Sequence, residues 1–221
     1  MATSIFPFND DLDAITMNYS WKLDKHSVLF QKYFQLNEYS LSHELYRGGY
    51  SNLFTREMFE RGAVVALLPY DPKCRKVVLI EQFRAGAMGD EKSPWLIECI
   101  AGVIEEGESE TQVAIRESYE EAGCDIKQLH AISRYYVSPG CSTEICTLYC
   151  GIIDSTGIGG IHGLAEENED IRVELVDAKI AYTWVCEAKI KSSATIIALQ
   201  WLQLNEERLI RDSLDAGSKG E

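Results

Sequence analysis

The residues of this chain best suited to chemistry are glutamates within GVIEEGESETQVAIRESYEEAGC, residues 102–124. Residues 112–122 contain no glycine or proline and are mostly helix formers, so they are predicted to form a helix. Offsets of three and four residues place Glu117, Glu120 and Glu121 on neighbouring positions of one helix face. Such carboxylates repel one another unless divalent cations neutralise them, and Mg²⁺ typically joins one or two carboxylates to substrate phosphates. The pattern therefore predicts a metal-dependent site for a phosphate-bearing substrate.

The spacing of these charges and of the flanking glycines resembles the signature of the Nudix hydrolases. That signature is glycine, five residues, Glu, seven residues, Arg-Glu, an apolar residue, any residue, Glu-Glu, any residue, glycine and a closing apolar residue. The positions that match it are Gly102, Glu108, Arg116, Glu117, Glu120, Glu121 and Gly123. Ser118 stands where a bulky aliphatic residue is usual and is expected to loosen the helix slightly, whereas Cys124 can act as a small hydrophobe at the closing position. The alternative, an acidic helix that merely faces solvent, leaves this register unexplained.

Composition favours a soluble cytoplasmic protein. The 221 residues are 46% hydrophobic, which is enough for one large domain or two small ones, and the formal net charge of −14 argues against binding to a nucleic-acid backbone. The N-terminal residues have neither a basic start nor an apolar core, so no secretory signal is expected. The longest apolar run, near residues 63–68, is too short to span a bilayer. The seven cysteines contain no C-x-x-C pair and are interpreted as reduced thiols rather than as a zinc site or a disulfide framework.

Hydrophobic patterning predicts a single α/β domain preceded by a smaller β piece. The β piece contains two strand-like runs between residues 26 and 46, separated near Asn37. Two continuous apolar strands, AVVALLPY and KVVLIEQF, are joined by a turn at residues 71–73. Residues 155–170 are rich in glycine and then acidic, which predicts a mobile loop. The other predicted strands are WLIEC, LHAISRYYVS, STEICTLYCGII and IRVELV.

Two further helices are predicted near the C-terminus. Asp177 is placed to cap a helix that runs through Ile190. Ser192 or Ser193 is placed to cap a last helix that runs to about Ile210.

The resemblance extends beyond the motif, from about Val28 to Leu204, and is to the ADP-ribose pyrophosphatase branch of the Nudix hydrolases. Pro139 lies fifteen residues after Cys124, where that branch usually has a proline. The resemblance implies a Nudix α/β/α sandwich with an N-terminal antiparallel β subdomain. The other segments that carry it are REMFERGAVVALLPYD, VVLIEQFR, SPWLIECIAGVIEEGE, VSPGCSTE, GIHGLAEENEDIRV and IALQWLQL.

The resemblance also implies domain boundaries and an activity. Residues 1–59 would form the N-terminal subdomain, which exchanges with a second subunit and helps to bind the base, residues 60–212 the catalytic domain, and residues 213–221 a disordered tail. The implied reaction is Mg²⁺-dependent hydrolysis of ADP-ribose to AMP and ribose 5-phosphate, with Mn²⁺ as an alternative ion. The expected partners are a nucleoside diphosphate sugar and a second copy of the chain in a homodimer with shared active sites, but neither nucleic acid nor a membrane.

The predicted metal ligands centre on the motif helix. Glu117 and Glu121, one helical turn apart, come first, and Glu120 assists them. The resemblance adds the backbone carbonyl of Ala101, just before the signature glycine, and the side chain of Glu169.

A general base is expected outside that helix, because cations occupy its carboxylates. The resemblance places the catalytic glutamate at Glu167 in the acidic run AEENED, although residue type alone would favour a solvated loop there. It also gives Arg116 the role of orienting the metal-binding glutamates, and Glu108 a similar supporting role.

Substrate contacts are expected from residues scattered along the chain. Arg84, at the end of an apolar strand, is a candidate for the pyrophosphate. The resemblance implies that Arg56 reaches the adenine side from the partner subunit and that Tyr33 faces the adenine ring, although residue type alone would favour ordinary packing for Tyr33. Ser138 and Glu144, which flank the Pro139 turn, are expected to bind the terminal ribose.

Three alternatives compete with ADP-ribose hydrolysis. The same residues could hydrolyse another nucleotide sugar, such as GDP-mannose or ADP-glucose. A non-catalytic Nudix module that senses a nucleotide would be expected to lack signature glutamates, which are all present here. A structural or interaction protein would leave the charged helix without a purpose.

Overall fold

The computed structural model describes residues 19–165 and 168–217. The chain divides into two compact units. The smaller one, called here the N-terminal unit, comprises residues up to 63 together with residues 135–145. The larger one, called the sandwich unit, comprises residues 64–134 and the chain from residue 146 onward.

The N-terminal unit is built on an antiparallel sheet of three strands in the described part of the chain, in the order β1 (Trp21–Gln31), β2 (Gln35–His43), β3 (Phe54–Glu60). The predicted break near Asn37 is wrong. The turn lies at residues 32–34, and Asn37 lies inside β2, opposite Val28 of β1 and Met58 of β3. Asn37 is tolerated there because its side chain bonds to neighbouring side chains, which satisfies its amide without a turn.

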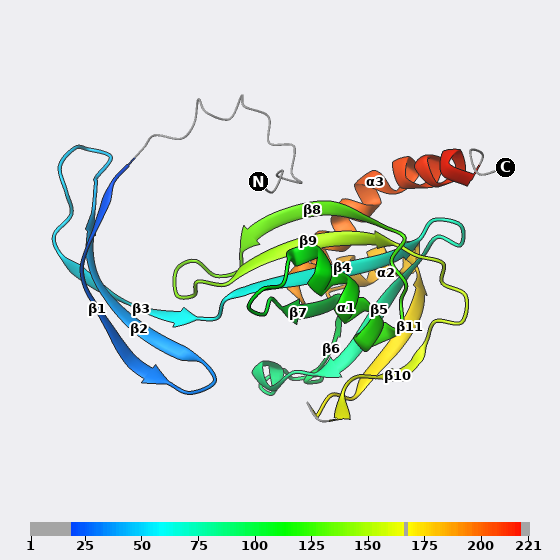
Figure 1. Cartoon of the computed structure of the whole chain (residues 1–221), viewed down its shortest axis with the longest axis horizontal. Coiled ribbons are helices and arrows are strands. Elements are labelled where there is room, and N and C mark those ends of the chain that lie inside the picture. Colours follow the sequence, from blue (N-terminus) through cyan, green and yellow to red (C-terminus); the bar gives the residue numbers. More distant parts are fainter. Residues whose placement is uncertain (1–18, 166–167, 218–221) are drawn as a thin grey trace. The chain divides into compact units, whose positions relative to one another are not determined.

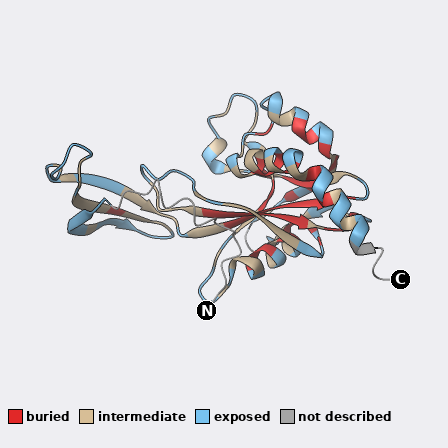
Figure 2. Ribbon diagram, turned by 90° about the horizontal axis from the view of Figure 1, so that it is seen from above, coloured by how far each residue is buried: buried red, intermediate tan, exposed pale blue. Residues whose placement is uncertain are grey.

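The sandwich unit contains a sheet that is eight-stranded in the described residues, with the order β10-β11-β5-β4-β9-β8, where β6 adds to β5 and β7 adds to β4. One face carries α1 and the other carries α2 and α3 (Figures 1 and 2). The strands are β4 (Ala63–Asp71), β5 (Lys76–Phe83), β6 (Trp95–Glu98), β7 (Ile100–Val103), β8 (Gln128–Tyr136), β9 (Ile145–Ile152), β10 (Gly160–His162) and β11 (Ile171–Asp177). The helices are α1 (Glu110–Ala122), α2 (Ala178–Cys186), α3 (Ser193–Gly217) and a short 3-10 turn, η2 (Ala85–Ala87).

The core lies where helices cover both faces of the central strands. Residues Val65 through Asp71 of β4 are all buried, as are Val77 through Ile80 of β5. A strand that is apolar on both faces needs a cover on each side, which explains why these two runs show no alternation in the sequence. Figure 2 shows the buried residues gathered along this sheet and on the inward sides of its helices. The predicted α/β/α sandwich with an antiparallel β piece at its N-terminal side is confirmed.

Several predicted boundaries differ from the structure. Residues 160–162 form β10, which pairs with β11, so the prediction of a loop throughout residues 155–170 is wrong there. Strand β7 was not predicted, because Cys99 separates it from β6 by a single residue. Helix α2 ends at Cys186 rather than Ile190, whereas α3 continues to Gly217, into the stretch where a disordered tail was expected.

Two further features bear on the class of protein. All seven cysteines lie within the described residues, and none of them is joined in a disulfide. Among those same residues, no helix is long and apolar enough to cross a membrane.

Candidate active site

Helix α1 carries the predicted site and is fixed at both ends by its own sequence. At its start, the Ser109 hydroxyl accepts from the backbone N–H of Gln112, while the Gln112 side chain accepts from the N–H of Ser109. At its end, Gly123 adopts a left-handed conformation with φ 62°, which glycine reaches at little cost. The predicted helix over residues 112–122 is confirmed, and it begins two residues earlier, at Glu110.

Gly102 is required because Glu117 lies against it. A Cβ atom at position 102 would come within 1.9 Å of Glu117 Oε1, so any side chain there would displace the carboxylate. The glycine that opens the motif therefore lets the helix approach strand β7 closely. This contact explains in physical terms why a glycine and a glutamate fifteen positions apart belong to one pattern.

Glu121 is anchored to the same strand. Its side chain is nearly buried, at 4% exposure, and Oε2 accepts a hydrogen bond of 3.2 Å from the backbone N–H of Ala101. Ala101 itself pairs with Ala66 of β4, in the middle of the sheet. The residue predicted to offer its carbonyl to a metal is thus next to one of the predicted carboxylate ligands.

Arg116 organises the glutamates around it. Its guanidinium donates two bonds to Glu108, from Nε at 2.9 Å and from Nη2 at 3.0 Å, which is the bidentate geometry that suits a carboxylate. Its Nη1 donates to Glu117 at 2.9 Å and to Glu120 at 3.1 Å. The bond from Arg116 is the largest cause that lowers the pKa of Glu108. This geometry supports the expected orienting roles of Arg116 and Glu108.

The inner carboxylates occupy an unfavourable electrostatic environment. Burial first, and then the charges of Glu117 and Glu169, raise the pKa of Glu121 to about 8, against the opposing effects of the Ala101 N–H and of Arg84. Burial and the charges of Glu120 and Glu169 also raise the pKa of Glu117, although Arg116 opposes this. Neighbouring carboxylates, one buried and one partly buried, form a donor set that suits a hard divalent cation, which would lower both pKa values again.

The carboxylates do not form a ready cage by themselves. In residues 19–165 and 168–217, no group of three His, Cys, Asp or Glu side chains is arranged to hold a metal ion. Glu117 and Glu120 accept instead from Arg116, and Glu121 accepts from Ala101. The coordination of a cation at this site therefore requires further oxygen ligands, such as a backbone carbonyl or substrate phosphates.

Glu169 and Arg84 reach the electrostatic neighbourhood of these glutamates from other elements. Glu169 Oε2 accepts from the N–H of Leu164 at 3.2 Å. Arg84, directly after β5, donates from Nε to Glu98 of β6 at 2.6 Å. Glu98 was missed in the sequence, although a single charge inside the apolar run WLIEC is a signal that could have identified it.

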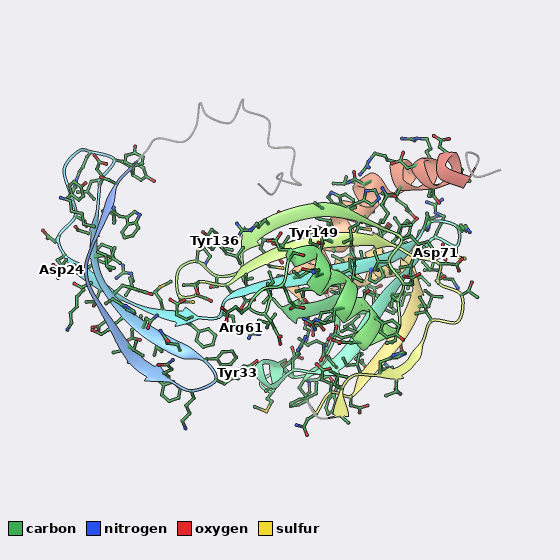
Figure 3. The ribbon with its side chains drawn as sticks, viewed as in Figure 1. Asp24, Tyr33, Arg61, Asp71, Tyr136 and Tyr149 are labelled. Carbon is green, nitrogen blue, oxygen red and sulfur yellow. The ribbon has the colours of Figure 1, made fainter. Side chains whose placement is uncertain are left out.

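The remaining predicted residues belong to the N-terminal unit. Tyr33 lies in the turn between β1 and β2, 84% exposed and packed edge-on against Phe34 (Figure 3). Arg56 on β3 lines a groove of about 570 Å³ together with apolar side chains of the same sheet. Ser138 and Glu144 lie in the loop between β8 and β9.

Two further predictions concern the general base and the effect of Ser118 on the helix. Glu167, the predicted base, lies outside the described residues. Ser118 does not leave the helix loose: its buried hydroxyl lies 2.8 Å from the carbonyl of Ile115 and 3.1 Å from that of Cys124. Because the hydroxyl is satisfied at the end of α1, the departure from an aliphatic residue is compensated locally.

In this α/β/α sandwich, one helix packed on the sheet carries clustered glutamates that a single arginine orients. This arrangement is typical of metal-dependent hydrolases that act on phosphate anhydrides. The chain belongs to the Nudix family, since the family model described as "NUDIX domain" matches residues 60–212.

Curated relatives agree with this assignment. The chain is 48% identical over 182 residues to the ADP-ribose pyrophosphatase of Escherichia coli strain K12, which covers 82% of this chain and 87% of the relative. It is 46% identical over 185 residues to the ADP-ribose pyrophosphatase of Haemophilus influenzae, covering 82% and 85%. It is also 30% identical over 190 residues to the GDP-mannose pyrophosphatase of Cronobacter sakazakii, covering 85% and 97%.

Proposed function

We propose that this enzyme is an ADP-ribose pyrophosphatase, which hydrolyses ADP-ribose to AMP and ribose 5-phosphate in a Mg²⁺-dependent reaction, with Mn²⁺ as an alternative ion. The choice of substrate is supported by relatives of that name at 46–48% identity, against 30% for a relative named for GDP-mannose. The observation that carries the chemistry is the placement of two carboxylates against β7. Glu121 is buried and accepts from the N–H of Ala101, and the partly buried Glu117 lies against Gly102.

Glu117, Glu121 and the carbonyl of Ala101 would hold the metal, with Glu120 and Glu169 assisting. When bound there, Mg²⁺ neutralises phosphate charge and lowers the pKa of water. Two features of the chain support this assignment. Arg116 keeps Glu117 and Glu120 turned to one side of α1, and the Ala101 N–H holds Glu121 against β7. Because these carboxylates are oriented in advance, little ordering remains to be done when the substrate arrives.

Protons and phosphate charge are assigned to other residues. Arg84 would bind the pyrophosphate; its guanidinium is partly exposed and already oriented by Glu98. Glu167 would serve as the general base that takes the proton from the attacking water. This role rests on the sequence and on the family, because Glu167 lies outside the described residues.

A homodimer with shared active sites is part of the proposal. Among the described residues of the N-terminal unit, Asn37 is the only buried one, so its sheet has no apolar core of its own. Strand β1 exposes Trp21, Leu23 and Phe30, each between 47% and 69%. A sheet of this kind needs a cover, and a second subunit would supply it. Tyr33 and Arg56 would then contact the adenine bound by the partner, while Ser138 and Glu144 would contact the terminal ribose.

The domain boundaries, the location and the excluded partners complete the proposal. We propose an N-terminal subdomain at residues 1–59 and a catalytic domain at residues 60–212. We propose a cytoplasmic location, supported by seven cysteines that form no disulfide in the described residues. We propose neither nucleic acid nor a membrane as partner, supported by the net charge of −14.

A panel of nucleotide sugars tests the proposal. Release of phosphomonoester is measured for ADP-ribose, ADP-glucose and GDP-mannose, each with Mg²⁺, with Mn²⁺ and with a chelator. We expect the highest kcat/KM for ADP-ribose and no turnover in the chelator. A preference for GDP-mannose would favour the second candidate, and turnover that survives the chelator would refute the metal-dependent chemistry.

A further inference from the structure

The loop between β8 and β9 is hydrogen-bonded to the end of β3. The backbone N–H of Phe59 donates to the carbonyl of Cys141 at 2.8 Å, and the N–H of Thr143 donates to the carbonyl of Phe59 at 3.1 Å. The pair Phe59 and Ser142 forms a parallel bridge. The loop that contains Ser138 and Glu144 thus takes its shape from strand β3 as well as from the strands that it connects.

Glu60, the last residue of β3, uses both carboxylate oxygens in this arrangement. Oε2 accepts from the hydroxyl of Thr143 at 2.9 Å. Oε1 accepts from the hydroxyl of Tyr39 at 2.9 Å and from the amide of Asn37 at 3.1 Å. Burial alone would raise the pKa of Glu60, but the bonds from Tyr39, Thr143 and Asn37 lower it, so the carboxylate stays ionised and keeps accepting.

The neighbouring residue strengthens the attachment. Arg61 pairs with Glu144 at 3.4 Å and lies over the ring of Phe34 at 4.9 Å. Two successive residues at the end of β3, Glu60 and Arg61, therefore hold two successive residues of the loop, Thr143 and Glu144. A polar network that is fully bonded specifies one geometry more strictly than apolar packing does.

We propose that Glu60 is a positioning residue, which acts through Thr143 to hold the β8–β9 loop in the shape that binds the terminal ribose of the substrate. This inference rests on the proposed hydrolysis of ADP-ribose. Glu60 touches no reacting atom in this role. It orders the loop before the substrate binds, which reduces the entropy lost on binding and places Ser138 and Glu144.

Thr143→Val keeps the shape of the side chain and removes the hydroxyl that donates to Glu60 at 2.9 Å. The same hydroxyl lies 3.4 Å from the carbonyl of Phe59 and accepts from the N–H of Arg61 at 3.4 Å, so Thr143→Val is read together with the Glu60 variants. Glu60→Ala removes the bond between Thr143 and Glu60 by deleting the carboxylate instead of the hydroxyl. Glu60→Gln, unlike the alanine variant, keeps an oxygen that can accept from Tyr39 and Asn37. Glu57→Gln is the matched control, since Glu57 lies exposed on the same strand, opposite Glu38.

Each variant is tested by steady-state kinetics with ADP-ribose and by hydrogen exchange of residues 137–144 without substrate. For Thr143→Val we expect KM to rise about tenfold with kcat nearly unchanged, because a less ordered loop holds Ser138 and Glu144 less well against the terminal ribose. We expect hydrogen exchange in the loop to become faster. Glu60→Ala should behave alike, Glu60→Gln should recover most of the loss, and the control should match the wild type.

Two results would overturn the inference. One is a Thr143→Val enzyme with the KM and loop exchange of the wild type. The other is a parallel fall in kcat, thermal stability and exchange protection throughout the chain, which would mean a structural role only. If the wild-type enzyme itself fails to hydrolyse ADP-ribose, the proposed function is refuted, whereas normal wild-type turnover with an unchanged KM in Thr143→Val refutes only the positioning role.

Discussion

Glu121 of helix α1 accepts a hydrogen bond of 3.2 Å from the backbone N–H of Ala101 on strand β7, across twenty residues of sequence. This bond joins the helix that carries the glutamates to the strand that precedes them. The loop between them returns the chain so that Gly102 meets Glu117 and Ala101 meets Glu121.

Glu117→Gln is expected to reduce turnover by several orders of magnitude while the fold stays intact. The change keeps the shape of the side chain and removes one negative charge from the proposed cation site. Turnover is measured over a Mg²⁺ titration, with the exposed Glu106→Gln as the control. Near-normal activity at saturating Mg²⁺ would refute the assigned role.

Gly102→Ala is expected to abolish most of the activity. The added methyl group would lie 1.9 Å from Glu117 Oε1, so the carboxylate has to leave its position or the helix has to move away from β7. Kinetics together with circular dichroism will separate a local from a global effect. Gly107→Ala, where no atom lies within 4 Å but φ is +90°, controls for the loss of glycine flexibility alone. Wild-type turnover in Gly102→Ala would show that the close approach does not matter.

Ser118→Ala is expected to lower the free energy of unfolding by about 1 kcal/mol and to spare catalysis. The substitution removes a buried hydroxyl that lies 2.8 Å from the carbonyl of Ile115 at the end of α1. Denaturant unfolding measures the change. An unaltered midpoint would mean that the hydroxyl contributes no stability.

Glu167→Gln is expected to lower kcat by roughly 10²–10⁴, the usual range for a lost general base, with substrate and Mg²⁺ affinity little changed. The neighbouring Glu166→Gln should be nearly silent and serves as the matched control. Identical behaviour of the two variants, or loss of metal binding in Glu167→Gln, would contradict the assignment.

The assembly is expected to be a homodimer at micromolar concentration, measured by light scattering. Leu23→Asp places a charge in the groove of about 570 Å³ on the N-terminal unit and should shift the population towards monomer. Lys25→Ala, on the same strand, should not. A fully active wild-type monomer would exclude active sites shared between subunits.

Much of the fold was predictable because its signals are local. The apolar runs of β4 and β5, the capped helix α1, the Asp177 cap of α2 and the turn at Asp71 all follow from neighbouring residues. Asp71, for example, accepts from the N–H of Lys73 within its own turn. The predictions that were wrong concern residues whose conformation depends on partners distant in the sequence. Asn37 looked like a turn residue, yet the carboxylate of Glu60 holds it inside a strand.

The sequence by itself determined the family, the α/β class and the identity of the glutamates, because the spacing of a helical motif is recorded in consecutive residues. Only the tertiary structure decided which partners those glutamates meet. The approach of Glu117 to Gly102, the anchoring of Glu121 on Ala101, the pairing of Arg84 with Glu98 and the attachment of Thr143 to Glu60 all join residues from different elements. Such contacts depend on how strands and helices pack, and the order of residues along the chain does not show which atoms of different elements meet.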